Sequence, residues 1–173
     1  MKETQYKNFS LKTHKKNWLL KKPNVCQFEL SFGCNLHCKH CYKDCYNKPA
    51  YLKKELKTKE VKLLLDKVQN AGVIWLCLTG GDTLTRGDFL GIYSYAKEKG
   101  FIVTIFTNGY SMTEEIAGYF KKKPPFAIEI TLNAVTGDLY EKISRAKGSF
   151  DKMMNGINLM LKEKLPLKIK TAV

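Results

Sequence analysis

The sequence has no apolar run of about 18 residues, the length that a membrane-spanning helix requires. Residues 1–22 are rich in lysine and lack the apolar centre of a secretory signal peptide. We therefore expect a protein that stays in the cytoplasm and makes no contact with a membrane. Disulfide bonds are rare in that compartment, so a cluster of cysteines indicates metal binding or redox chemistry.

Arginine is also scarce. The 30 Lys plus Arg residues include only Arg86 and Arg145, and against 16 Asp plus Glu they give a formal charge of +14. A charge of this size attracts nucleic acid or an acidic peptide. The lysines, however, are scattered through every segment, as in proteins of a lysine-rich proteome. The charge by itself therefore does not favour nucleic acid as the partner.

Length and composition indicate one folded domain, because 173 residues with 44% hydrophobic side chains can bury a normal core. Residues 1–24 carry many lysines and few apolar anchors. We predict that they form a basic lead segment, either a solvated arm or a short capping element. Residues 25–173 are predicted to form the core domain.

Apolar stretches typical of strands alternate with patterns typical of amphipathic helices along this core domain. The predicted strands are 25–32, 73–78, 101–106, 126–132 and 167–173, and polar capping residues predict helices that begin near Thr58, Thr85, Ser111 and Ser149. Five β/α units with short connections favour an α/β fold with parallel strands and right-handed crossovers. The chain stops inside the fifth predicted strand, which suggests a fragment or a minimal form.

Three closely spaced cysteines follow the first predicted strand. Cys34, Cys38 and Cys41 stand at spacings of four and three, in a segment too short for a strand or a packed helix, so a loop can wrap their thiols around one point. An iron-sulfur cube normally takes four cysteine thiolates. Three thiolates would leave one iron open to a substrate.

Zinc is the alternative metal. A structural zinc site prefers four closed tetrahedral ligands, and Cys45, His37 or His40 would complete such a set. A third interpretation is that the cysteines are close by chance. Six cysteines in 173 residues, four of them inside twelve positions, make chance the weakest of the three.

The Cys-x3-Cys-x2-Cys pattern, followed by the aromatic Tyr42, resembles the cluster loop of the radical S-adenosylmethionine (radical SAM) superfamily. The resemblance implies that Cys34, Cys38 and Cys41 hold a [4Fe-4S] cluster whose fourth iron is chelated by S-adenosylmethionine. It also places His40 and Tyr42 beside the cofactor. An electron from a reduced flavodoxin or ferredoxin-type donor would then cleave the cofactor to a 5′-deoxyadenosyl radical, which abstracts hydrogen from a substrate.

A second motif, Gly80-Gly81-Asp82, follows the second predicted strand and resembles the Gly-Gly-Glu that binds the methionine amine in the family. Two glycines let a backbone approach a ligand closely. Aspartate in place of glutamate keeps the acceptor and shortens its reach by one methylene. On local grounds alone, a glycine turn with Asp82 as a helix-capping residue is an equally good interpretation.

The third and fourth predicted strands end in further motifs of this kind. Thr107, Asn108 and the following glycine form a turn by residue type and resemble the Thr-Asn-Gly of many radical SAM proteins, which implies that Thr107 or Asn108 touches the cofactor. Residues 130–134 resemble the Ile-Ser-Leu-Asp-Gly of the family. This likeness implies cofactor contacts from Thr131, which retains a hydroxyl, and from Asn133.

Residues 140–145 and 148–150 resemble a short helix and an Arg-x-x-Gly-Ser-Phe stretch of radical SAM enzymes that mature peptides and proteins. The resemblance implies that Arg145 pairs with the methionine carboxylate, for which a guanidinium offers a bidentate fork. A surface ion pair with Glu141, one helical turn earlier, is the structural alternative. The substrate that this likeness implies is a peptide or a protein.

The fold implied by the family is a partial (β/α) barrel, of which about five β/α units would be present here. Its motifs would lie at the C-terminal ends of the strands, where β/α barrels build active sites. We expect neither a sixth strand nor the auxiliary-cluster domain called SPASM in this chain. Two other classes stay open: a four-cysteine zinc-binding basic module for nucleic acid, and an inactive truncated barrel.

Overall fold

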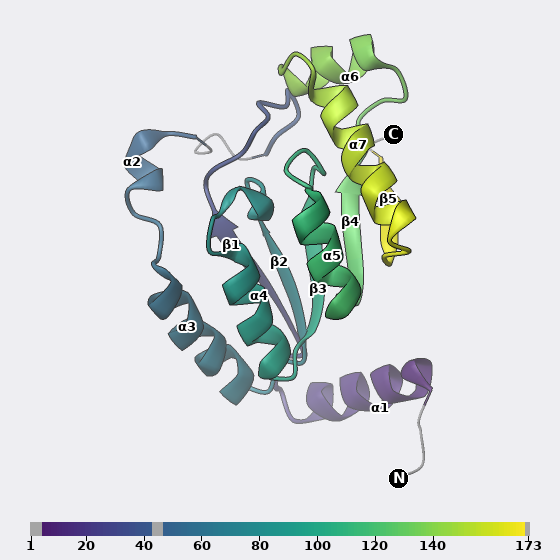
Figure 1. The fold of residues 1–173 in the computed structure, drawn as a ribbon. Helices are drawn as coiled ribbons and strands as arrows, with labels where there is room; N and C mark the ends of the chain where they lie inside the picture. The colour runs from purple at the N-terminus through teal and green to yellow at the C-terminus, as the bar shows by residue number, and fades with distance from the viewer. Residues whose placement is uncertain (1–4, 43–46, 172–173) are drawn as a thin grey trace.

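The computed structural model describes residues 5–42 and 47–171. Five parallel strands form one sheet in which the order in space follows the order in the chain (Figure 1). They are β1 (Val25–Ser31), β2 (Trp75–Gly80), β3 (Ile102–Thr107), β4 (Ala127–Thr131) and β5 (Leu167–Lys170). Each crossover therefore moves the chain one strand along in the same direction, as in a β/α barrel. The α/β fold of parallel β/α units predicted from the sequence is confirmed.

Helices cover one face of this sheet. α3 (Thr58–Asn70), α4 (Phe89–Glu98), α5 (Glu114–Lys122) and α7 (Ser149–Lys162) lie along it, and α6 (Gly137–Ser144) lies beyond the ends of the strands (Figure 1). The side chains between the sheet and the helices are apolar and fully buried: Leu76, Leu78, Val103, Ile105, Ile128 and Ile130. None of the described helices is both long and apolar enough to span a membrane.

The opposite face of the sheet carries polar side chains, because side chains alternate along each strand. The register sets Phe106 of β3 beside Glu129 of β4, and Glu129 beside Lys168 of β5. Glu129 forms ion pairs with Lys168 (3.8 Å) and with Lys170. This inner face is the concave side of the partial barrel, and it leads to the C-terminal ends of the strands.

The first helix, α1 (Tyr6–Leu19), lies in the segment that the sequence predicted as an arm or a capping element. The indole N–H of Trp75 donates a hydrogen bond to the Tyr6 hydroxyl (2.9 Å), and the His14 ring stacks on Trp75 at 4.4 Å. Trp75 begins β2, so α1 lies under the N-terminal ends of the strands (Figure 1).

Several helix starts differ from the sequence prediction. Thr58 is the first helical residue of α3 and donates its hydroxyl proton to Asp88 (2.6 Å) instead of capping the helix. Thr85 ends the short 3-10 helix η1 (Thr83–Thr85), and α4 begins four residues later. The cap of α5 is Thr113, whose hydroxyl accepts from the Ile116 N–H (3.2 Å), and not the predicted Ser111. The N-terminal caps are therefore Lys57 for α3, Asp88 for α4 and Thr113 for α5.

α7 packs closely on the turn after β3, and Gly156 lies at the point of contact. A Cβ at Gly156 would lie 2.2 Å from the Gly109 carbonyl oxygen, whereas a Cβ at Gly118 of α5 would meet no heavy atom within 4 Å. Alanine stabilises a free helix position by about 1 kcal/mol relative to glycine. We expect Gly118→Ala to raise the free energy of unfolding, and Gly156→Ala to lower it by about 1–3 kcal/mol through overpacking. Chemical denaturation measures both, and equal stabilisation by the two substitutions would contradict this packing.

Candidate functional site

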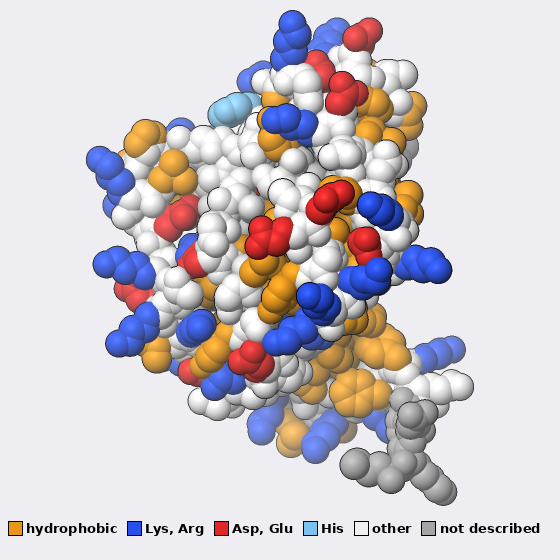
Figure 2. Space-filling model, viewed as in Figure 1, with side chains coloured by type: hydrophobic (Ala, Val, Ile, Leu, Met, Phe, Trp, Pro, Cys, Tyr) orange, Lys and Arg blue, Asp and Glu red, His pale blue; other side chains and the backbone are white. Residues whose placement is uncertain are grey.

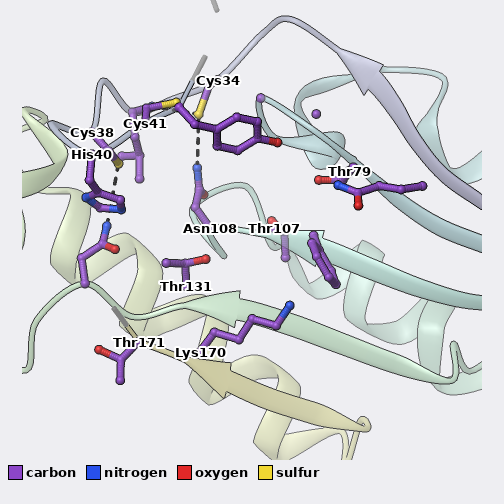
Figure 3. A pocket seen from close by; sticks show the side chains of 17 residues that line it. Cys34, Cys38, His40, Cys41, Thr79, Thr107, Asn108, Thr131, Lys170 and Thr171 are labelled. Carbon is purple, nitrogen blue, oxygen red and sulfur yellow. Dashed lines mark hydrogen bonds between the residues drawn. The ribbon is translucent and has the colours of Figure 1, made fainter. Parts of the chain in front are cut away.

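A cavity of about 600 Å³ lies at the C-terminal ends of the strands, beneath the cysteine loop (Figure 3). Of the residues predicted to bind metal or cofactor, all but Asp82 and Arg145 line it. These lining residues are Cys34, Cys38, His40, Cys41, Tyr42, Gly80, Gly81, Thr107, Asn108, Thr131 and Asn133. The sheet thus brings together, at the C-terminal ends of its strands, residues that are spread over about a hundred positions of the chain.

The cysteine loop is held in place by the end of α6. The N–H of His37 donates to the Ser144 carbonyl, and the N–H of Lys39 donates to the Ile143 carbonyl, both at 2.9 Å. The last carbonyls of a helix have no partner within the helix, so they are free to accept these bonds. At the other side of the loop, the Cys34 N–H donates to the side-chain oxygen of Asn47 (2.8 Å).

The three thiols differ in exposure. Cys34 and Cys38 are half-buried and Cys41 is exposed. Burial raises the pKa of Cys34 to about 11 and also raises the pKa of Cys38. A raised thiol pKa favours the protonated form, and a metal binds only the thiolate, so a metal ligand at either position would have to lose its proton. Asn108 and Asn133 direct their amide N–H groups at the sulfurs of Cys34 and Cys38, at 3.7 Å each.

The backbone packing at Gly80 and Gly81 leaves no room for a side chain. Gly80 has φ +139°, and a Cβ there would lie 2.5 Å from the Ser31 carbonyl oxygen; a Cβ on Gly81 would lie 2.2 Å from that of Gly33. The missing side chains allow the end of β2 to pass directly against the end of β1. Gly81 donates its N–H to the Ser31 carbonyl at 2.8 Å. Both glycines also present backbone to the cavity.

Asp82 is turned away from the cavity and is 1% exposed. Its carboxylate accepts hydrogen bonds from the Leu84 N–H (3.0 Å), the Thr107 hydroxyl (2.9 Å) and the Asn108 N–H (3.1 Å). Burial raises the pKa of this carboxyl group. In this structure the carboxylate caps η1 and joins the end of β2 to the end of β3, which is the local alternative that the sequence left open. Its contact with a methionine amine stays a prediction.

Arg145 also lies outside the cavity lining. It is exposed, it ends α6, and its backbone has the left-handed conformation with φ 53°. Glu141, its alternative partner, accepts a hydrogen bond from the Gly148 N–H (2.8 Å). The assignment of Arg145 to the methionine carboxylate stays a prediction.

The sequence interpretation missed several lining residues, namely Gln27, Leu36, Thr79, Phe106, Lys170 and Thr171. Lys170 reaches into the cavity from β5, with its ammonium 3.5 Å from the centre of the Phe106 ring (Figure 3). Four of these residues occupy inward-facing positions on strands. The alternation of side chains along each strand places these four residues on the inner face. It does not show that they line one cavity, because that depends on the register of neighbouring strands.

The Asp82 carboxylate can be tested by its amide isostere. Asp82→Asn places an N–H2 group where the structure needs an acceptor, so a buried donor loses its partner, at a cost of about 1–3 kcal/mol. We expect a lower denaturation midpoint for Asp82→Asn. Asp66→Asn is the control, because the Asp66 carboxylate pairs with Lys99 (2.6 Å) at the surface, where ion pairs contribute little. Equal effects of the two substitutions would contradict the buried network.

Residues 28–172 match the family model described as the Radical SAM superfamily. The chain belongs to this superfamily. Membership implies an iron-sulfur cluster and S-adenosylmethionine as cofactors. The family match covers most of the chain, and it includes the cysteine loop, the second half of β1 and all of β2, β3, β4 and β5.

Two relatives of this radical SAM chain carry the names of different activities. It is 31% identical over 152 residues to an AdoMet-dependent heme synthase of Methanosarcina barkeri, covering 87% of this chain and 43% of that protein. It is 29% identical over 129 residues to the mycofactocin maturase MftC of Mycolicibacterium smegmatis, covering 75% of this chain and 32% of that one. The chain thus spans less than half the length of these two relatives.

A solved structure has the same fold. Streptococcus suis SuiB, bound to its precursor peptide SuiA, superposes with a TM-score of 0.74 at 15% identity, over 94% of this chain and 36% of that chain. At this identity the likeness concerns the fold alone. It agrees with the partial barrel of parallel β/α units described above.

The residues at the cavity fit a cluster and a nucleoside-sized cofactor. Three thiols of one loop line the same space, which is within the range of about 300–1,000 Å³ typical of small-molecule sites. The Asn133 side-chain oxygen is buried and has no hydrogen-bond partner within the described residues, which leaves an acceptor for a ligand. In the part of the chain that is described, no three Cys, His, Asp or Glu residues are grouped to hold a single ion. The closed zinc alternative needs a fourth ligand, which would be His37, His40 or Cys45, and Cys45 lies outside the described residues.

Proposed function

We propose that this chain is the core of a radical SAM enzyme, in which Cys34, Cys38 and Cys41 hold a [4Fe-4S] cluster and S-adenosylmethionine occupies the cavity beside it. The observation that carries the proposal is that the three thiols and the ends of β2, β3 and β4 line one cavity. When bound, the cluster and its cofactor supply reductive cleavage of the sulfonium and abstraction of a hydrogen atom from the substrate.

The residues of the chain would position the cofactor. Gly80 and Gly81 offer backbone groups in the cavity wall, and Thr131 offers a hydroxyl at the end of β4. His40 and Tyr42 close the cavity from the loop side. The apolar ring of Phe106 lines the inner end of the same space. This mixture of apolar wall and few polar groups is typical of small-molecule sites.

The electron would come from a reduced flavodoxin or ferredoxin-type protein. Cys41 is exposed, so one ligand of the proposed cluster lies at the surface, where a redox partner can approach. Nucleic acid is not favoured as a partner. On the face shown in Figure 2, Lys and Arg side chains are interspersed with Asp and Glu and do not form one continuous basic patch.

We propose a peptide or protein as the substrate. Two observations support this class: the likeness of residues 140–150 to peptide-maturing enzymes, and the names of MftC, a maturase, and SuiB, solved with a precursor peptide. The second candidate is an iron tetrapyrrole, favoured by the 31% identity to a heme synthase. A titration with hemin, followed through its Soret band, separates the two classes, because only the second predicts saturable binding.

The metal assignment is tested by single Cys→Ala variants after anaerobic reconstitution, with iron and sulfide counted per chain. We expect Cys34→Ala, Cys38→Ala and Cys41→Ala to lose the cluster and deoxyadenosine formation, because each removes one of three thiolates. Cys45→Ala should retain both. Cys26→Ala is the control, since that half-buried thiol lies at the start of β1.

The same reconstitution experiment also tests the zinc site and the inactive barrel. Zinc in place of iron, with comparable loss of metal in all four loop variants, would overturn the radical SAM assignment in favour of a closed tetrahedral site. Absence of iron and sulfide from the wild-type chain under reconstitution would favour the inactive barrel.

Arg145 is tested by its affinity for S-adenosylmethionine. If its guanidinium pairs with the methionine carboxylate, Arg145→Ala removes a charge-assisted hydrogen bond of about 1.5–3 kcal/mol. We therefore expect the dissociation constant to rise about 10-fold to 100-fold. Lys142→Ala, on the exposed side of α6, is the matched control for loss of one positive charge. Unchanged binding in Arg145→Ala would remove Arg145 from the site.

A further inference from the structure

We propose that Asn108 and Asn133 act on the cluster itself, by donating N–H···S hydrogen bonds to the thiolates of Cys34 and Cys38 that raise the reduction potential of the cluster. The inference rests on the proposed function, since it requires that these cysteines hold the cluster. It assigns the two asparagines to the sulfurs, whereas the sequence motifs had suggested only contact with S-adenosylmethionine.

The two asparagines occupy equivalent places in the fold. Asn108 follows the end of β3 and Asn133 follows the end of β4, the next strand in the sheet. The side-chain nitrogen of Asn108 lies 3.7 Å from the Cys34 sulfur, and that of Asn133 lies 3.7 Å from the Cys38 sulfur (Figure 3). Two neighbouring strands therefore each send one amide to a different cysteine of the loop above them.

The orientation of the Asn108 amide follows from its neighbours. Its side-chain oxygen accepts a hydrogen bond from the Tyr110 N–H (2.8 Å), and a backbone N–H can only donate. The N–H2 group must therefore be the end that faces Cys34. The backbone of Asn108 is itself held by the buried Asp82 carboxylate (3.1 Å), so the donor is positioned before any cofactor binds.

The Asn133 amide likewise directs its N–H2 group at a cysteine sulfur. Its nitrogen faces Cys38, and its buried oxygen has no partner among the residues that the structure describes. The reversed orientation would set a carbonyl oxygen against a thiolate, and two acceptors repel each other. Cys34 receives a further donor, the Leu36 N–H at 3.5 Å.

These donors would raise the reduction potential of the cluster because they stabilise its negative charge. Reduction adds one negative charge to a cluster, and hydrogen bonds to its sulfurs stabilise negative charge. Removing a donor should therefore make reduction harder and lower the midpoint potential. Replacing the amide by a carboxylate of the same shape removes the donor and adds a negative charge, so it should lower the potential further.

The experiment is a redox titration followed by electron paramagnetic resonance, on reconstituted chains without S-adenosylmethionine. Leaving out the cofactor separates an effect on the cluster from an effect on cofactor binding. The variants are Asn108→Ala, Asn133→Ala, both together, Asn108→Asp and Asn133→Asp. Asn158→Ala is the control, because Asn158 is exposed on α7. Iron and sulfide per chain are measured first.

We expect the midpoint of Asn158→Ala to equal that of the wild type, each Ala variant to be lower, each Asp variant to be lower than its Ala counterpart, and the double variant to be lower than either single one. Loaded variants with the midpoint of the wild type overturn the inference while leaving the proposed function intact. Loss of the cluster from the Ala and Asp variants alike also overturns it, because the amides would then act on assembly. A wild-type chain without cluster overturns the proposed function and the inference with it.

Discussion

The buried carboxylate of Asp82 is the constraint on which the arrangement of the site depends. It holds the Leu84 N–H, the Thr107 hydroxyl and the Asn108 N–H at once, and so it joins the ends of β2 and β3. Asn108 in turn reaches the sulfur of Cys34. A chain of hydrogen bonds thereby connects the end of β2 to the cysteine loop, although Asp82 itself does not line the cavity.

The cavity exists because the helices cover only one face of the sheet. Leucine, isoleucine and valine side chains fill the layer beneath the helices, and the alternation of the strands directs the polar side chains to the other face. On that face the Glu129 carboxylate is mostly buried, and its negative charge is paired with the ammonium of Lys170. The same ammonium lies over the Phe106 ring. A buried carboxylate without such a partner would be costly, so this pair keeps a polar wall stable inside the barrel.

The segment that resembles peptide-maturing enzymes has a structural task as well as a proposed functional one. The carbonyls of Ile143 and Ser144, at the end of α6, hold the backbone of the cysteine loop. Arg145 follows directly, with a left-handed backbone that ends the helix and exposes its side chain. Conservative changes in α6 would therefore shift the cysteine loop through these backbone hydrogen bonds, without any contact between α6 and a substrate.

The sequence by itself determined the five strands, their order, the helices between them and the motifs at the strand ends, because periodicity, glycine turns and cysteine spacing are local properties. It therefore predicted the parallel β/α fold and most residues of the cavity. Only the tertiary structure decided the direction of Asp82, which points to Thr107 instead of the cavity, and the inclusion of Lys170 and Phe106. Those features depend on strand register and on partners distant in the chain, and no local pattern carries them.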